Sequence, residues 1–133
     1  MKTLNKKSTE ILYKLMNMMS EDHYARIDNS NGAFMAVSIE GIFENEKYKQ
    51  ISVAHYYQQN GDLMADPEMI FIYVKANGSF IPCYYKQDGI LLSEEESVKF
   101  ENGEITAYRK NMQESHYIFA NIWLKNIKHQ QNL

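Results

Sequence analysis

Four Asn-Gly dipeptides divide the middle of this chain into short segments. They stand at residues 31–32, 60–61, 77–78 and 102–103. Both residue types tolerate positive φ angles, which the two-residue type I′ turn of a β-hairpin requires, so Asn-Gly between β-like runs is a strong hairpin signal. The sequence therefore predicts an antiparallel sheet in the middle of the chain.

The third Asn-Gly, at residues 77–78, can be tested by writing out the pairs of a two-residue hairpin. In that register one face holds only apolar side chains: Ile70, Ile72, Val74, Ile81 and Cys83. A face that is apolar on both strands is predicted to point into the core. Pro82 falls at a non-hydrogen-bonded position, so strand 79–86 is expected to be a sheet edge near Pro82 or to carry a bulge there.

More strands are predicted on both sides of this hairpin. Around the fourth Asn-Gly the same register places Phe100 opposite Ile105, with polar residues on the reverse face. Residues 33–42 and 49–57 have the composition of two further strands, joined by a charged loop. The acidic stretch 93–97 is expected to be a solvated turn.

Helices are predicted at both ends of the chain, because apolar residues recur there with a helical period. In residues 3–20 the stripe consists of Leu4, Ser8, Ile11, Leu15 and Met18, flanked by Leu12 and Met19. In residues 113–130 it consists of His116, Phe119, Ala120, Trp123 and Ile127, widened by Tyr117 and Leu124. We therefore expect a single α+β domain over residues 1–133, with an N-terminal and a C-terminal helix on one face of an antiparallel sheet of five or six strands, a hairpin meander.

Composition narrows the class of protein. The chain has 133 residues, 44% of them hydrophobic and 23% charged, which is typical of one globular domain with its own core. A net charge of -3 provides no basic field for non-specific nucleic-acid binding. One cysteine, Cys83, excludes an internal disulfide, and no apolar run is long enough for a signal peptide or a membrane span. We expect a cytoplasmic protein without a membrane partner.

The stretch YYQQNGDLMADPEM, residues 56–69, is the least ordinary in the chain. If its Asn-Gly closes a simple hairpin, His55 faces Asp66, and Glu68 lies on the same core-directed face. With Asp62 in the turn, these side chains could form a general acid/base pair or a site for a metal ion. The enzymatic hypothesis is therefore a metal-assisted hydrolase.

The simpler interpretation of the same residues is a hairpin corner. Asp66 would cap the turn before Pro67, Asp62 would occupy a turn position, and His55 would lie at the edge of the core, satisfied by a neighbouring carboxylate. We favour this interpretation because no close metal-ligand spacing such as His-Glu-x-x-His occurs, and we predict neither a metal nor a cofactor. Cys83 is expected to be an inert core thiol.

A second candidate site is the face of the third hairpin that points away from Ile70 and Ile72. It carries aromatic side chains with basic neighbours: Phe71, Tyr73, Phe80 and Tyr84, flanked by Lys75 and Lys86. Readers of single-stranded nucleic acid use such a face to stack bases and hold phosphates. Cross-strand packing, or a surface beneath a helix, explains the same stripe more simply.

Three blocks of the chain resemble a small uncharacterised bacterial domain family. The long block has the pattern His-Tyr-Tyr-x-Gln-Asn-Gly-Asp-Leu-Met-x-Asp-Pro-Glu-Met and matches His55, Tyr56, Tyr57, Gln59, Asn60, Gly61, Asp62, Leu63, Met64, Asp66, Pro67, Glu68 and Met69. The shorter blocks match Tyr84, Tyr85, Gln87 and Asp88, and the Trp-Leu-Lys-Asn run from Trp123 to Asn126. Residues 1–48 are not covered, and residues 91–103 depart from the family's usual linking region.

The resemblance implies a setting rather than an activity. Members of that family occur in proteins of conjugative transposons, plasmids and phages, sometimes beside antirestriction-type modules, and no catalytic residue is established for them. The resemblance therefore favours a non-enzymatic binding or accessory module of a bacterial mobile element, with a protein as its partner. The metal-assisted hydrolase and the reader of single-stranded nucleic acid remain the two alternatives.

Overall fold

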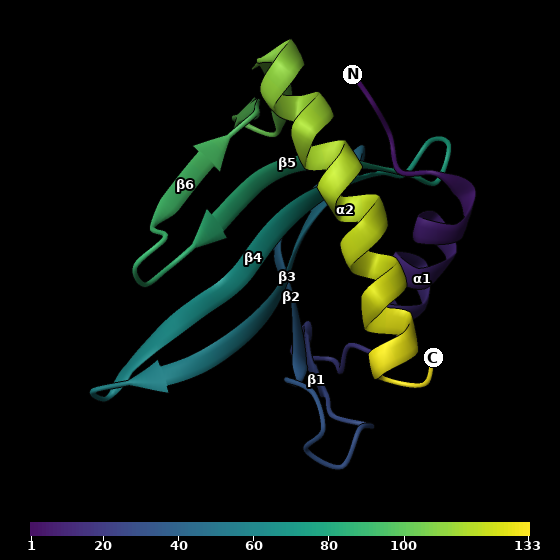
Figure 1. The fold of residues 1–133 in the computed structure, drawn as a ribbon. Helices are drawn as coiled ribbons and strands as arrows, with labels where there is room; N and C mark the ends of the chain where they lie inside the picture. Colours follow the sequence, from purple (N-terminus) through teal and green to yellow (C-terminus); the bar gives the residue numbers. More distant parts are fainter.

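The structure is a computed structural model that describes all residues of the chain, 1–133. Figure 1 shows ten elements, which follow one another as α1 (Lys6–Met16), β1 (Tyr24–Ile27), β2 (Val37–Glu44), β3 (Tyr48–Gln59), β4 (Asp62–Val74), β5 (Ser79–Gln87), β6 (Ser93–Glu96), β7 (Val98–Glu101), β8 (Glu104–Tyr108) and α2 (Lys110–Gln130). The predicted helices at both ends and the strands between them are confirmed.

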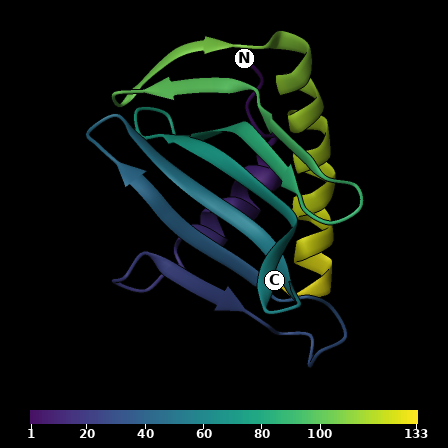
Figure 2. The same cartoon turned by 90° about the vertical axis from the view of Figure 1, so that its left-hand side faces the viewer.

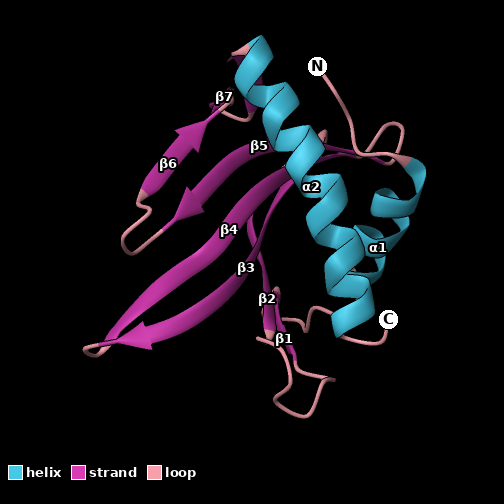
Figure 3. Ribbon diagram, in the orientation of Figure 1, coloured by secondary structure: helices cyan, strands magenta, loops and turns pink.

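The first six strands form one antiparallel sheet in chain order, so the predicted meander is confirmed. β7 and β8 form a separate two-stranded sheet. Both helices lie against the same face of the large sheet, as Figure 3 shows, and the long β3–β4 hairpin extends beyond them. The chain is an α+β domain of the expected architecture.

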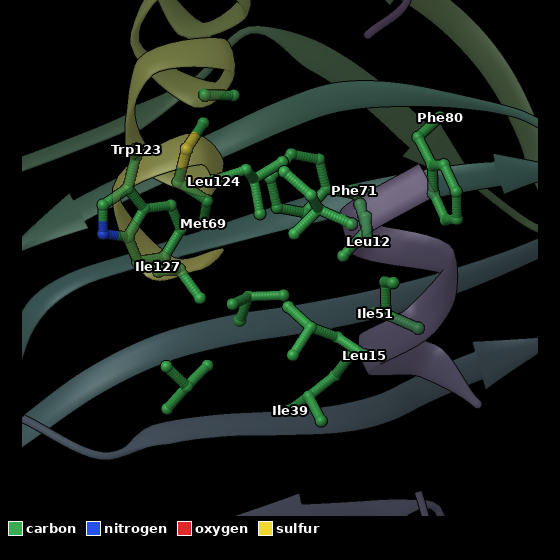
Figure 4. Close-up of a cluster of buried hydrophobic side chains, with 14 of the residues drawn as sticks. Leu12, Leu15, Ile39, Ile51, Met69, Phe71, Phe80, Trp123, Leu124 and Ile127 are labelled. Carbon is green, nitrogen blue, oxygen red and sulfur yellow. The ribbon is translucent and has the colours of Figure 1, made fainter. Parts of the chain in front are cut away.

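The main core lies between this sheet and the helices. It contains sixteen buried residues, ten of which are labelled in Figure 4: Leu12, Leu15, Ile39, Ile51, Met69, Phe71, Phe80, Trp123, Leu124 and Ile127. α1 begins where the Asn5 side chain accepts a hydrogen bond from the Ser8 main-chain N–H at 2.9 Å, which satisfies a free donor of the first turn. The apolar stripe of each predicted helix is the face that packs on the sheet.

A second, smaller core lies on the other face of the sheet. β7 and β8 cover it, and its buried members are Ile72, Ile81, Cys83 and Val98. Figure 2, which shows the molecule from the strand side, places these two strands beside the end of the sheet formed by β4 and β5. Burial raises the pKa of the Cys83 thiol, which agrees with the predicted inert core cysteine.

The predicted two-residue turns at the second and fourth Asn-Gly are confirmed, and the register predicted at the third is wrong. Gln59 pairs with Asp62, as a two-residue hairpin at the second Asn-Gly requires. The third turn instead has four residues, 75–78, because Gly78 N–H bonds the Val74 carbonyl and Val74 pairs with Ser79. The Asn77 side chain accepts the Ser79 main-chain N–H at 3.0 Å, so this asparagine closes the turn through its side chain.

The predicted irregularity at Pro82 is confirmed. Phe71 pairs with Pro82 and Ile70 pairs with Tyr84, so Cys83 is an extra residue in β5. β6 pairs with β5 only from Tyr84 onward, so the part of β5 before Tyr84 lies at the sheet edge. The bulge moves Tyr84 to the face of Ile70, whereas the regular register placed it on the opposite face.

Two strands were not predicted. β1 is short and pairs only with β2, and the sequence around it has no clear alternation. The acidic stretch 93–97, predicted as a solvated turn, contains β6, an edge strand in which Glu94 pairs with Lys86. A polar edge strand is stabilised by its ladder and by such cross-strand pairs, so its sequence need not be apolar.

Candidate functional site

The bulge in β4 decides where the residues of the predicted acid/base site lie. Between the pairs Ala54–Glu68 and Tyr56–Ala65, β3 contributes one residue and β4 contributes two, Asp66 and Pro67, joined by a cis peptide bond. In a regular register His55 and Glu68 would share a face of the sheet. The extra residue in β4 shifts the alternation of its side chains by one position, so His55 and Glu68 lie on opposite faces.

His55 belongs to the helix-covered face. Its ring contacts Trp123 edge to face at 5.6 Å, and its Nδ1 lies 2.9 Å from the Ala36 carbonyl oxygen. The residue is buried. The simpler interpretation of His55 as a satisfied residue at the edge of the core is therefore correct, although its partner is a main-chain carbonyl rather than a carboxylate.

The carboxylates of Asp62, Asp66 and Glu68 lie in three different places. Glu68 accepts a hydrogen bond from the Ser52 hydroxyl at 2.5 Å, and Asp66 accepts one from Gln87 Nε2 at 2.7 Å. Asp62 is exposed at the tip of the β3–β4 hairpin. No three His, Cys, Asp or Glu side chains come together anywhere in the chain as a group that could hold a metal ion. The expected cluster of His55 with two carboxylates on one face is wrong.

Glu68 still affects a neighbouring tyrosine. Burial is the largest cause that raises the pKa of Tyr56, and the negative charge of Glu68 adds to it. Both effects favour the neutral phenol. Tyr56 is thus a hydrogen-bonding group of the sheet surface rather than a base at neutral pH.

The predicted aromatic face is divided between the core and the surface. Phe71 and Phe80 are fully buried beneath the helices, and Tyr73 packs on Phe80 with a ring separation of 4.8 Å. Tyr84 lies on the other face and donates a hydrogen bond to Glu94 at 2.9 Å. No continuous stacking platform exists, and the simpler interpretation of a surface beneath a helix is correct for Phe71 and Phe80.

The two lysines that flank this predicted face are both engaged. Lys75 Nζ lies 2.6 Å from Glu44 Oε2 and 2.7 Å from the Asn45 carbonyl oxygen. Lys86 Nζ lies 3.9 Å from Asp88 Oδ1. Neither lysine stands beside an exposed aromatic row, so the arrangement proposed for binding single strands is not present.

A different polar group was missed by sequence reasoning. His116 of α2 lies between Ser97 and Glu95, with Nδ1 2.7 Å from Ser97 Oγ and Nε2 3.1 Å from Glu95 Oε1. This order of side chains is reminiscent of a catalytic triad, but Ser97 is only 1% exposed and no substrate can reach its hydroxyl. The three residues instead join α2 to the corner between β6 and β7. The only sequence signal for this group of three residues was a histidine in the apolar stripe of the C-terminal helix.

The end of the molecule opposite the helices carries the most exposed aliphatic side chains. Ile90, Leu91 and Leu92 follow one another in the β5–β6 loop and are 102%, 79% and 72% exposed. Leu63, at the start of β4, is 61% exposed. We call these four residues the aliphatic corner. In Figure 1 the β5–β6 loop and the tip of the β3–β4 hairpin both extend to the side away from the helices.

The two parts of the aliphatic corner are joined at their base. Asp88 N–H donates to the Ala65 carbonyl at 2.9 Å, and Ala65 N–H donates to Asp88 Oδ2 at 2.8 Å. Gly89 follows with a φ of +92, and a Cβ there would lie 2.9 Å from the Tyr57 hydroxyl. The positive φ favours glycine, and a side chain here would also have to displace the Tyr57 hydroxyl, so the exposed loop starts from a defined position.

A groove lies elsewhere, between α1 and α2. It has a volume of about 790 Å³ and contains none of the residues predicted as a site. Its walls are polar and rich in lysine. We call it the lysine groove; its lining residues are Asn5, Lys7, Ser8, Glu10, Ile11, Lys14, Asn121, Lys125, Lys128, His129 and Leu133.

Comparison with known proteins finds one family. Residues 6–133 match the model described as "Domain of unknown function (DUF6908)". The chain belongs to this family. The match includes most of the N-terminal part that the resemblance left uncovered, and it agrees with an uncharacterised domain. Neither the curated proteins nor the solved structures contain a significant match to the DUF6908 chain.

The matched range of this DUF6908 domain contains every element of the fold, both helices and all eight strands. The aliphatic corner and almost all of the lysine groove's lining therefore lie within the family domain; Asn5 alone precedes the match. Neither helix is both long enough and apolar enough to span a membrane.

Proposed function

We propose that this domain is a non-enzymatic binding module of a bacterial mobile element, and that it holds a protein partner through the aliphatic corner. The observation that carries the proposal is the exposure of three consecutive aliphatic side chains, Ile90, Leu91 and Leu92. Single exposed apolar residues are common on protein surfaces, but contiguous ones indicate an interaction site. Burying them in a partner would remove this apolar surface from water.

The charges around the aliphatic corner indicate the chemistry of the partner. Asp62 stands at the hairpin tip next to Leu63, and Glu94 follows Leu92 closely. This acidic surrounding repels the anionic surface of a bacterial membrane. It favours a protein whose apolar recess is bordered by basic residues, because opposite potentials steer association and select the partner.

The polar residues of the long block support a non-enzymatic role. His55, Asp66 and Glu68 each already bind a partner group within the chain. Their hydrogen bonds hold the β3–β4 hairpin and its bulge in shape, and this hairpin carries Leu63. In the proposal, the block that resembles the mobile-element family acts as the frame of a binding surface.

Photo-crosslinking in cells tests the proposal. A photoreactive amino acid is placed at Leu91, and at Ile122 of α2 as the matched control, since Ile122 is also an exposed aliphatic residue at 58% exposure. We expect one dominant crosslinked protein from position 91 only, encoded by the same mobile element. Equal crosslinking from both positions, or none from position 91, would contradict the proposal.

The same partner, once purified, gives a quantitative test by calorimetry. Leu91→Asp is expected to weaken binding by about 30-fold or more, since a residue at the centre of an interface contributes roughly 2 kcal/mol or more. Ile122→Asp should leave the dissociation constant unchanged. The unfolding free energy of Leu91→Asp should stay within about 0.5 kcal/mol of the parent, because the side chain contacts little within the chain.

A further inference from the structure

The lysine groove is the place where positive charge gathers on this acidic protein. The two helices carry six lysines, Lys6, Lys7, Lys14, Lys110, Lys125 and Lys128, against two glutamates, Glu10 and Glu114. The other fifteen of the seventeen acidic residues lie outside the helices. The net charge of -3 therefore conceals a division into a basic helical layer and an acidic sheet layer.

The lysines of the groove stand on both walls and along its length. α1 and α2 lie side by side and run in the same direction in Figure 1, and the Asn5 N–H bonds Asn121 Oδ1 at 3.2 Å where α1 begins. Lys7 and Lys14 are separated by about 10 Å along α1, given the rise of an α-helix. Lys125 and Lys128 line the opposite wall. The cations thus form two rows that face a common channel.

None of these four lysines is in an ion pair. The seven salt bridges of the chain involve other basic residues. Glu10 is the only carboxylate side chain that lines the groove. Four cationic side chains that line one groove with a single carboxylate side chain repel one another, and a bound anion would relieve that repulsion. The groove is suited to a negatively charged ligand.

The other lining residues decide which kind of anion fits. A small-molecule pocket has mostly apolar walls with a few polar groups, but Ile11 and Leu133 are the only hydrophobic residues here. No Phe, Tyr or Trp side chain lines the groove, and His129 is its only ring, so the groove lacks the row of aromatic side chains on which successive bases stack. The groove can neutralise phosphates in a row without reading a sequence.

We infer that the lysine groove binds the sugar-phosphate backbone of a nucleic acid without sequence preference. Contacts between lysine and phosphate contribute affinity but carry no sequence information. The acidic sheet layer, which includes Glu40, Glu68 and Glu96, turns away from the polyanion and orients the helical layer toward it. This site is separate from the aliphatic corner, so one domain can hold a protein and a nucleic acid at the same time.

Fluorescence anisotropy with labelled 20-nucleotide single strands and 20-base-pair duplexes tests the inference. We expect the logarithm of the binding constant to fall with the logarithm of salt concentration with a slope of roughly -3 for four lysines on a single strand. Two oligonucleotides of unrelated sequence should bind equally. Absence of binding in low salt, or a strong preference for one sequence, would overturn the inference.

A matched pair of charge-reversal variants separates the groove from net charge. Lys7→Glu with Lys125→Glu changes two groove residues, whereas Lys6→Glu with Lys110→Glu makes the same charge change on the same two helices away from the groove lining. The groove variant is expected to bind at least about ten-fold more weakly in low salt, with a slope smaller by roughly two. Equal weakening by both variants would show that only overall charge matters and would refute a groove site.

Two further measurements complete the test. Displacement of the oligonucleotide by pyrophosphate at micromolar concentration would identify a small-anion site and overturn the inference. Binding of the protein partner by the groove variant should be unchanged, because the aliphatic corner is intact. Failure of nucleic-acid binding is thereby distinguished from failure of the protein-binding proposal.

Discussion

Both faces of the six-stranded sheet carry buried apolar residues, but the two faces are covered in different ways. On one face, two helices cover a sixteen-residue cluster. On the other, the small β7–β8 sheet covers four buried residues near one end, and polar groups such as Ser52 and Glu68 occupy the surface beyond it. The difference teaches that an apolar row in a strand shows burial but not which element buries it.

This difference explains why side-chain alternation left two hypotheses open for the aromatic face. The wholly aliphatic side of Ile70, Ile72 and Val74 was assigned to the core, and the aromatic side was left as either a stacking surface or, more simply, a surface beneath a helix. In the structure the aromatic side faces the larger core, and the aliphatic side faces the smaller one. A strand buried on both faces has no outward side for alternation to identify.

The largest expected effect compares one isoleucine from each face. Ile51 lies in the larger cluster, Ile72 lies in the smaller one, and both are fully buried. Each change to Ala should lower the free energy of unfolding by about 2–5 kcal/mol, with Ile51→Ala the more costly, because β7 and β8 can settle onto a cavity more easily than two packed helices. Urea denaturation measures both. A larger loss for Ile72→Ala would reverse the ranking of the two faces.

A smaller effect is expected where the two faces meet. His116 connects α2 to Ser97, between β6 and β7. His116→Ala should lower the free energy of unfolding by about 1–3 kcal/mol, since it leaves the buried Ser97 hydroxyl without its partner. His129→Ala on the same helix is the control, because His129 is exposed and should change stability by less than about 0.5 kcal/mol. Equal effects would mean that the buried hydrogen bonds of His116 do not hold the corner.

The smallest effect concerns alkaline pH on the β7–β8 face. Burial is the largest cause that raises the pKa of Tyr84, and the hydrogen bond to Glu94 adds to it. A raised pKa means that the folded state favours the neutral phenol. This contribution is fully present below the unfolded tyrosine pKa of about 10 and is lost as pH rises through the higher folded value.

Urea denaturation at a series of pH values above neutrality, on the parent and on Tyr84→Phe, measures this contribution. The variant should lose less stability than the parent between neutral and alkaline pH, because it has no phenol to ionise at this position. Tyr13→Phe serves as the control, since Tyr13 is 47% exposed. An unchanged alkaline loss in Tyr84→Phe would show that other tyrosines carry the whole effect.

Sequence reasoning identified the parts of the fold that depend on local chemistry. Asn60-Gly61 and Asn102-Gly103 form tight turns because their residues accept positive φ, and the helical stripes are visible as a period. Local reasoning also anticipated a bulge near Pro82, since proline cannot donate to a ladder. It failed at β6, whose polar residues carry no strand signal of their own.

The candidate sites were harder to predict than the fold. Asp66-Pro67 was read as a turn feature, but it forms a bulge that separates His55 from Glu68. In the aliphatic corner, hydrogen bonds between Ala65 and Asp88 join the segments that carry Leu63 and Leu91, and no local pattern reveals this contact. The lysine groove requires Lys7 and Lys125, far apart in the chain, to line one channel.

The sequence by itself determined the α+β class, the meander and both helices, because periodicity and turn propensity act between neighbours in the chain. Tertiary structure alone decided which face of the sheet the helices cover, how β4 shifts at Pro67, and that four lysines of two distant helices line one groove. These outcomes depend on packing between distant segments. Each of these outcomes changes the sheet face on which a side chain lies, or its neighbours in space, although its neighbours in the sequence stay the same.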